Sequence, residues 1–154
     1  MDNFKISLNE AINAFRTADH LAYVSYPLLK DKRLLLAIVQ NLYLAGAKCM
    51  EALLRYERLY KRISVIPEDF NSRLSIIEKD LAKNANIGIK TLNSIRELDF
   101  LSKHHRDSPT EFYRRDKLVI CSEGFADIRT VDIELLKEHT SNLRKFLEVL
   151  KRLK

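Results

Sequence analysis

The densest group of residues that could do chemistry lies between positions 103 and 117. This segment holds five Lys or Arg, three Asp or Glu, and the adjacent histidines His104 and His105. Guanidinium and ammonium groups bind phosphates, and the nearby Phe112 and Tyr113 could stack on nucleic-acid bases. The segment therefore indicates contact with RNA or another polyanion. The alternative is that cations near a helix C-terminus only complement the helix dipole.

The histidine pair also allows a catalytic interpretation. Histidine exchanges protons near neutral pH, and the neighbouring Arg106 could stabilise charge that develops on a phosphate. Adjacent residues on a helix point about 100° apart, however. Neither histidine has an Asp, Glu or His four residues later that would complete a zinc-binding face. The alternative is that both histidines only cap a helix end at the surface.

The rest of the sequence carries no pattern that specifies a metal or a cofactor, and we expect none. It has no Gly-rich phosphate loop, nucleophile elbow or paired-Cys zinc motif. His20 and His139 are isolated, so we expect core or surface roles for them. Cys49 lies in the most apolar stretch and Cys121 in a separate segment, which predicts reduced thiols and no disulfide.

Length and composition favour one helical domain. The chain has 154 residues, 46% of them hydrophobic, and only three Gly and three Pro interrupt it. The sequence therefore predicts an all-α, up-down bundle of four to five helices over residues 1–154, with a small β-hairpin before the last helix. A single Gln beside many Lys, Glu and Arg is compatible with a thermophilic source.

The longest uncharged apolar stretch, residues 34–47, is shorter than the roughly 20 residues of a membrane span. The charged N-terminus does not resemble a signal peptide. We therefore expect a cytoplasmic protein that makes no membrane contact. The net charge of +6 favours an anionic partner.

Local patterns place the first two helices. Ser7 and Glu10 form a capping-box pattern, so the first helix should begin there and stop at Tyr26-Pro27. The second helix should cover about residues 32–63 and be central, because it is apolar on nearly every side. Ala45, Cys49 and Leu53 are its expected core residues. Four polar residues of this helix lie in one stripe along its surface: Asn41, Lys48, Glu51 and Arg55. The stripe indicates either ion pairs on the helix surface or a functional groove.

Later segments are placed by caps, breaks and periodicity. Pro67 fits the first turn of a third helix, and residues 84–88 form a break or a kink before a fourth helix that ends near residue 105. Ser108 and Glu111 form a second capping box, which predicts a short helix that contains Phe112 and Tyr113. Residues 117–122 and 127–131 predict the hairpin, packed through Leu118, Ile120 and Ile128, and residues 132–153 predict the last helix.

Topology then predicts where the cations gather. Consecutive helices joined by short loops run antiparallel, so the second and fourth helices should end at the same pole of the bundle. That pole would form the polyanion-binding site, made of six residues: Arg58, Arg62, His105, Arg106, Arg114 and Arg115.

Two stretches of the sequence resemble a known family. Residues 8–25 carry repeated alanines at helical spacing, and residues 36–54 place Glu51 among alanines before the apolar pair Leu53-Leu54. Together they resemble the first two helices of the HEPN group of small prokaryotic and archaeal helical bundles. The resemblance implies a helical bundle that often dimerises and that acts as a ribonuclease, a toxin or a nucleotidyltransferase partner.

The activity of such nucleases depends on an Arg followed after four to six residues by His, and that motif is absent. The nearest arrangement is Arg96 and His104, with seven residues between them. On a regular helix these two would lie about 80° apart, so only a break before His104 could bring them together.

Three functional hypotheses follow from these observations. The leading one is a non-catalytic HEPN-like module that binds RNA or another polyanion through the basic pole. The second is a metal-independent ribonuclease in which His104 or His105 is the general acid or base and Arg96 or Arg106 steadies the phosphate. The third is an interaction subunit, either a homodimer or a nucleotidyltransferase partner, that uses apolar residues on its outer helices.

Overall fold

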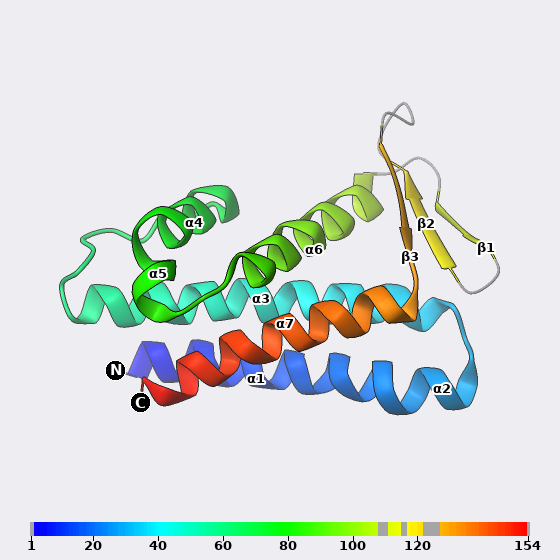
Figure 1. The fold of residues 1–154 in the computed structure, drawn as a ribbon, viewed down its shortest axis with the longest axis horizontal. Coiled ribbons are helices and arrows are strands. Elements are labelled where there is room, and N and C mark those ends of the chain that lie inside the picture. Colours follow the sequence, from blue (N-terminus) through cyan, green and yellow to red (C-terminus); the bar gives the residue numbers. More distant parts are fainter. Residues whose placement is uncertain (1, 108–110, 115–116, 122–126, 154) are drawn as a thin grey trace.

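The computed structural model describes residues 2–107, 111–114, 117–121 and 127–153. Its long helices lie side by side, and a small antiparallel sheet packs at one end of them (Figure 1). The long helices are α1 (Asp2–His20), α3 (Arg33–Leu59), α6 (Ile89–Asp107) and α7 (Ile133–Arg152). The expected all-α bundle with strands before the last helix is confirmed.

The first helical segment is longer than the sequence predicted at both ends. Ser7 lies inside α1, fully buried, and accepts a hydrogen bond of 2.6 Å from Arg55, so the expected capping box is wrong. The chain stays helical past Pro27, through the π-helical turn η1 (Leu21–Ser25) and α2 (Tyr26–Leu29). A π turn directly before a proline gives room for a residue that cannot donate a backbone hydrogen bond. Lys30, with a left-handed φ of 53°, ends α2.

Helix α3 is the centre of the bundle, as predicted. Ala45, Cys49 and Leu53 are fully buried in it, and burial raises the pKa of the Cys49 thiol. Glu51 pairs with Lys48 at 3.1 Å and with Arg55 at 2.7 Å, which confirms the expected ion pairs. Because Lys48 also pairs with Glu10 at 3.0 Å and Arg55 reaches Ser7, this stripe joins α3 to α1.

Short helical pieces follow α3: α4 (Phe70–Ile76), the π-helical turn η2 (Ile77–Leu81) and α5 (Ala82–Ala85). The expected start at Pro67 is wrong. Asp69 caps α4 instead, because its carboxylate accepts a hydrogen bond of 2.9 Å from the Ser72 backbone N–H. The break at residues 84–88 separates two helices, since Asn86 adopts a left-handed φ of 59° between α5 and α6.

The direction of this segment decides the topology of the bundle. Phe70 stacks on Tyr43, in the middle of α3, at a centroid distance of 5.7 Å. Leu81, farther along the segment, lines a cavity with Leu53 and Glu57 near the end of α3. The segment therefore runs in the same direction as α3, and α6 then runs back along α3 toward the end where α3 begins (Figure 1).

The sheet has three strands in the order β1-β2-β3: β1 (Glu111–Arg114), β2 (Lys117–Cys121) and β3 (Ile128–Val131). The predicted hairpin is confirmed as β2 and β3. The predicted short helix is wrong, because Phe112 and Tyr113 lie in β1 opposite Val119 and Leu118. A third strand adds stability that an isolated hairpin lacks, and this outweighs a local capping pattern. The expected cap residue, Ser108, lies outside the described residues.

The sheet packs on the bundle through one face. Leu118, Ile120 and Val131 are fully buried, whereas Ile128 is 57% exposed, so the expected role of Ile128 is wrong. Leu118 lies opposite Val131 in the antiparallel register, and side chains alternate between faces along a strand. Ile128 therefore points away from the face that carries Val131.

Helix α7 closes the bundle as predicted. Asp132 caps it by accepting a hydrogen bond of 2.9 Å from the Leu135 backbone N–H, and its apolar face, including Leu143 and Phe146, is buried. Within the described ranges, no helix combines the length and the apolar character that crossing a membrane requires.

Truncation of a central α3 side chain should be costly. Leu53 is fully buried, so Leu53→Ala should lower the free energy of unfolding by about 2–5 kcal/mol in chemical denaturation. The matched control is Leu29→Ala, since Leu29 is 68% exposed and should change that free energy by no more than about 0.5 kcal/mol. Equal effects of the two variants would show that α3 is not the core of the bundle.

Candidate polyanion-binding surface

The basic pole predicted from the sequence does not assemble. Arg58 and Arg62 lie at the end of the bundle where α1 begins and α7 finishes, because Arg58 lines a hollow with Asn3 and Arg62 lines a cavity with Leu153. His105 lies in the last turn of α6, at the opposite end, beside the sheet (Figure 1). The prediction that all six residues share one pole is therefore wrong.

The physical reason is the connection after α3. The prediction assumed short loops, but residues 60–69 carry the chain back to the middle of α3 before α4 begins. The loop therefore contains a reversal of chain direction that the prediction did not include. As a result, α6 runs in the opposite direction to the one predicted. Arg106, in the last turn of α6, and Arg114, at the end of β1, both lie at the sheet end, where the structure describes their backbone. Arg115 lies outside the described residues.

Arg62 is also engaged within its own end of the molecule. Its Nε donates to the Glu57 carboxylate, and this hydrogen bond raises the pKa of the guanidinium. The guanidinium carbon lies 5.5 Å from the Tyr56 ring centroid and 5.3 Å from that of Tyr60. A charge that is already paired and stacked is a poor contact for phosphate.

A different set of cations meets at the sheet end. We call this set the basic end, and it comprises four lysines: Lys30, Lys32, Lys103 and Lys117. Lys30 and Lys32 belong to the connection between α2 and α3, Lys103 to the last turns of α6, and Lys117 to the start of β2. Lys32 is half-buried and the other three are exposed. Three segments far apart in the sequence thus bring positive charge to one end of the fold (Figure 1).

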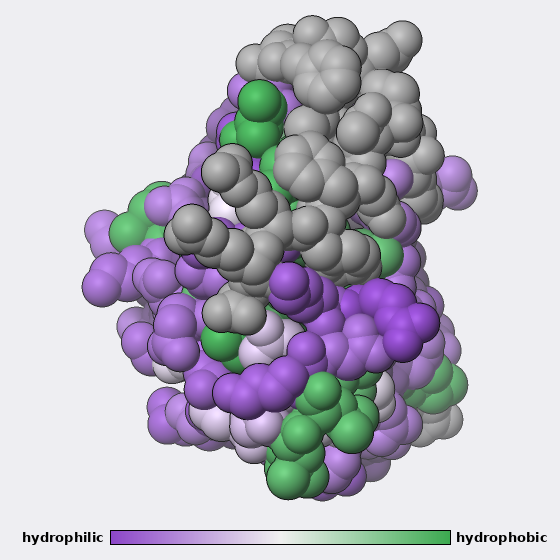
Figure 2. Space-filling view, turned by 90° about the vertical axis from the view of Figure 1, so that its right-hand side faces the viewer, coloured by the Kyte–Doolittle hydropathy of each residue, from purple (hydrophilic) through white to green (hydrophobic). Residues whose placement is uncertain are grey.

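The surface around the basic end is mixed in character. Figure 2 looks onto this end of the molecule and shows hydrophilic residues across its middle, with a hydrophobic patch below them. Arg33 lies in the same connection, but it forms a 2.7 Å ion pair with Asp31, whose pKa the guanidinium lowers through hydrogen bonds. The net contribution of that pair to the surface charge is therefore small.

The structure does not assemble the catalytic candidates. Helix α6 is unbroken from Ile89 to Asp107, so Arg96 and His104 stay about 12 Å apart along its axis. Arg96 forms an ion pair with Glu78 of η2, and the His104 ring lies 4.1 Å from that of Phe100. His105 is half-buried nearby, and the side chain of Arg106 is not described. The break before His104 that could have rescued the nuclease motif is not there.

Sequence reasoning missed a buried polar network between α6 and α7. His139 Nδ1 and Asn142 Nδ2 each lie 2.8 Å from the Ser94 hydroxyl oxygen. The Thr91 hydroxyl donates to the backbone carbonyl of Asn142 at 3.1 Å. His139 Nε2 is buried and has no hydrogen-bond partner among the described residues. The signal was available, because His139 and Asn142 interrupt the apolar stripe of α7 at helical spacing.

This network belongs to the core and is not an exposed active site. A serine beside a histidine is the pairing that activates a nucleophile, but Ser94 is only 3% and His139 only 6% exposed. A substrate could not reach either group without opening the bundle. The expectation that His139 has a core or surface role therefore holds, as a core role.

Known proteins do not add to this picture. Neither the family models, nor the curated proteins, nor the solved structures that we compared contain a match to this chain. Within the described part of the chain, no cluster of three or more His, Cys, Asp or Glu could hold a metal ion.

The buried histidine predicts how stability depends on pH. Burial lowers the pKa of His139 below its ordinary value of 6.5, while Glu138 acts weakly in the opposite direction. In the unfolded chain His139 therefore binds a proton more readily than in the native protein. The contribution of His139 to the free energy of unfolding has its full value above pH 6.5 and decreases as the pH falls below 6.5, because protonation of His139 then favours the unfolded chain. One such group contributes at most about 1.4 kcal/mol per pH unit.

The measurement compares the free energy of unfolding of the wild type and of His139→Gln between pH 7 and about pH 5. The wild type should lose stability more steeply over this interval. His20→Gln is the control, because His20 is exposed and should leave the steeper wild-type slope unchanged. Parallel curves for the wild type and His139→Gln would contradict the assignment.

Proposed function

We propose that this protein is a non-catalytic module that binds RNA, and that the basic end is its binding surface. The observation that carries the proposal is that three distant segments, each with an exposed lysine, lie at one end of the fold. Lysine ammonium groups act as point charges toward phosphates, and they position a nucleic-acid backbone without reading its bases. The net charge of +6 adds a long-range attraction to any polyanion.

The proposed mode of binding is electrostatic and independent of sequence. Each phosphate neutralised on a single strand releases counterions, and it contributes roughly −0.7 to the slope of log affinity against log salt concentration. Four lysines that each bind one phosphate would thus give a slope of about −3. The HEPN resemblance of residues 8–25 and 36–54 stays a prediction that agrees with this function.

The second candidate is an interaction subunit, either a homodimer or a nucleotidyltransferase partner. The observation in its favour is a group of exposed apolar residues at the end of the first helical segment, beside the basic end. Leu28 is 77% and Leu29 68% exposed, and Val24 and Tyr23 are exposed on the preceding turn. Apolar groups gathered in this way often mark protein contacts. The ribonuclease hypothesis has no such observation in its favour, because Arg96 is paired with Glu78.

Removal of two lysines from the basic end should weaken RNA binding at every sequence. We expect Lys30→Ala/Lys32→Ala to reduce the salt slope by about 1.4 in fluorescence anisotropy with labelled single strands. The matched control is Lys151→Ala/Arg152→Ala, which removes the same charge from the other end of the bundle, at the end of α7. Gel analysis of the same RNA, with and without EDTA, should show it intact.

Three outcomes would contradict the proposal. Equal losses in the two double variants would mean that the charge acts diffusely and that the basic end is not a site. Cleavage that disappears in His104→Ala/His105→Ala would favour the ribonuclease. If the wild type binds no RNA at low salt, the interaction subunit is favoured, and a solution mass above that of one chain, lost in Leu28→Asp/Leu29→Asp, would support it.

A further inference from the structure

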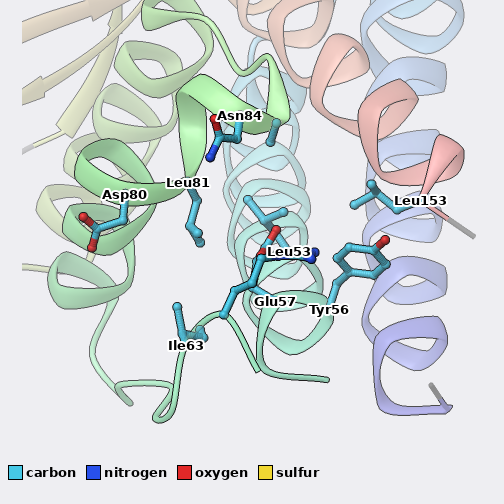
Figure 3. A pocket seen from close by; sticks show the side chains of 10 residues that line it. Leu53, Tyr56, Glu57, Ile63, Asp80, Leu81, Asn84 and Leu153 are labelled. Atoms are coloured by element: carbon cyan, nitrogen blue, oxygen red, sulfur yellow. The ribbon is translucent and has the colours of Figure 1, made fainter. Parts of the chain in front are cut away.

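A cavity of about 580 Å³ opens at the end of the bundle opposite the sheet. We call it the end cavity. Three parts of the chain build it: the last turns of α3 with the residues after them, the η2–α5 segment, and Leu153 after α7 (Figure 3). Its volume falls within the range of roughly 300–1,000 Å³ that small-molecule sites occupy.

The lining of the end cavity is mixed, with five apolar residues beside five that carry polar or charged groups. Leu53 is fully buried and Leu81 is 7% exposed, and Ile63 and Leu153 also belong to the apolar lining. Of the three charged residues in the lining, Glu57, Arg62 and Asp80, Glu57 is nearly buried and its carboxylate turns toward Leu53 (Figure 3). Ligand sites usually combine apolar surface with a few placed polar groups.

The position of Glu57 is unfavourable for a carboxylate for two physical reasons. The residue is only 9% exposed, and burial of a carboxylate is costly even when a cation pairs with it. It also lies in the last turn of α3, where the negative end of the helix dipole repels an anion. An apolar residue at this position would serve the core better. Local rules are broken in this way mainly at functional sites.

The turn after α3 holds the partner of Glu57 in place. Lys61 adopts a left-handed φ of 60°, and the Arg62 backbone N–H donates to the Glu57 carbonyl at 2.9 Å. This C-cap folds Arg62 back so that its Nε reaches Glu57 Oε2 while the guanidinium lies over Tyr56. Among the described residues, no hydrogen bond reaches the other carboxylate oxygen, Oε1. Because Oε1 is not among the buried atoms that lack a partner, it is reached by solvent, and the site keeps one accessible acceptor for a donor from outside.

From this arrangement we propose that the end cavity binds a small organic cation, namely a primary amine on an apolar body. The ammonium donates to Glu57 Oε1 and meets the negative end of the α3 dipole, and the apolar body contacts Leu81, Ile63 and Leu153. Asp80 also lines the cavity, although its exposed carboxylate points away from Glu57 (Figure 3), and it adds a second negative charge, so Glu57 and Asp80 together outweigh the single positive charge of Arg62. The excess of negative charge would repel an anion. A neutral ligand would gain no ionic interaction with Glu57.

The test uses the full chain and phenethylamine, a probe with a primary ammonium and an aromatic body. Titration is followed by methyl NMR, and shifts should concentrate on Ile63, Leu81 and Leu153. Phenethyl alcohol, which has the same shape without the charge, should bind at least tenfold more weakly, since hydrogen bonds between charged groups are the stronger ones.

Variants separate the site from general effects. Glu57→Gln should weaken phenethylamine binding about tenfold or more, and Asp80→Asn about two- to threefold because Asp80 is exposed. The matched control is Glu97→Gln, which removes a carboxylate paired with Arg129 at 3.3 Å outside the cavity, and it should not change the affinity. Ala85→Phe fills the cavity without altering any charge and should abolish binding, even if Glu57→Gln fails to fold.

Several results would overturn the proposal. They are equal affinity for phenethyl alcohol and phenethylamine, an equal loss in Glu97→Gln and Glu57→Gln, and unchanged binding in Ala85→Phe. Absence of methyl shifts at millimolar phenethylamine would overturn it as well. None of these results bears on RNA binding at the basic end, which lies at the opposite end of the molecule.

Discussion

Helix α3 is apolar on nearly every side, and α1, α6 and α7 all pack against it. Burial of its side chains supplies the main driving force for the fold, because apolar area removed from water stabilises in proportion to its size. Gly46 shows how closely the helices approach, since a Cβ there would lie 3.5 Å from Ile95 and 3.6 Å from Leu143. Apart from the exposed Gln40, the polar residues of α3 therefore lie in the stripe that meets α1 and near the two helix ends.

That constraint divides the molecule into two chemically different ends. The sheet end gathers lysines from connections and termini of elements, where charge stays in water and no partner within the core is required. The opposite end also carries exposed cations, such as Arg58, Lys151 and Arg152, but it holds in addition a carboxylate, Glu57, that is almost buried and is paired with Arg62. The first arrangement suits a large, solvated polyanion, and the second suits a small ligand that can be desolvated. The buried network around His139 joins α6 to α7 between the two ends.

Local sequence patterns failed where distant contacts offered a better alternative. Ser7 has the sequence of a helix cap, but the packing of α1 on α3 brings Arg55 to it and extends the helix past it. Phe112 and Tyr113 follow a capping pattern, but β2 provides a strand edge with which their backbone can pair. In both cases the residues that decide the structure are far away in sequence, so a short window could not contain the signal.

The sequence by itself determined the helical class, the central position of α3, the hairpin before α7 and the inward face of each long helix. All of these follow from composition, hydrophobic periodicity and β-branched runs, which are properties of the chain within a few residues. Only the tertiary structure decided which cations share an end, because the loop over residues 60–69 reverses the chain without any periodic pattern to reveal it. That reversal separates Arg62 from His105 and places Leu81 beside Glu57. Helix direction depends on contacts between segments, and no local property of a segment encodes it.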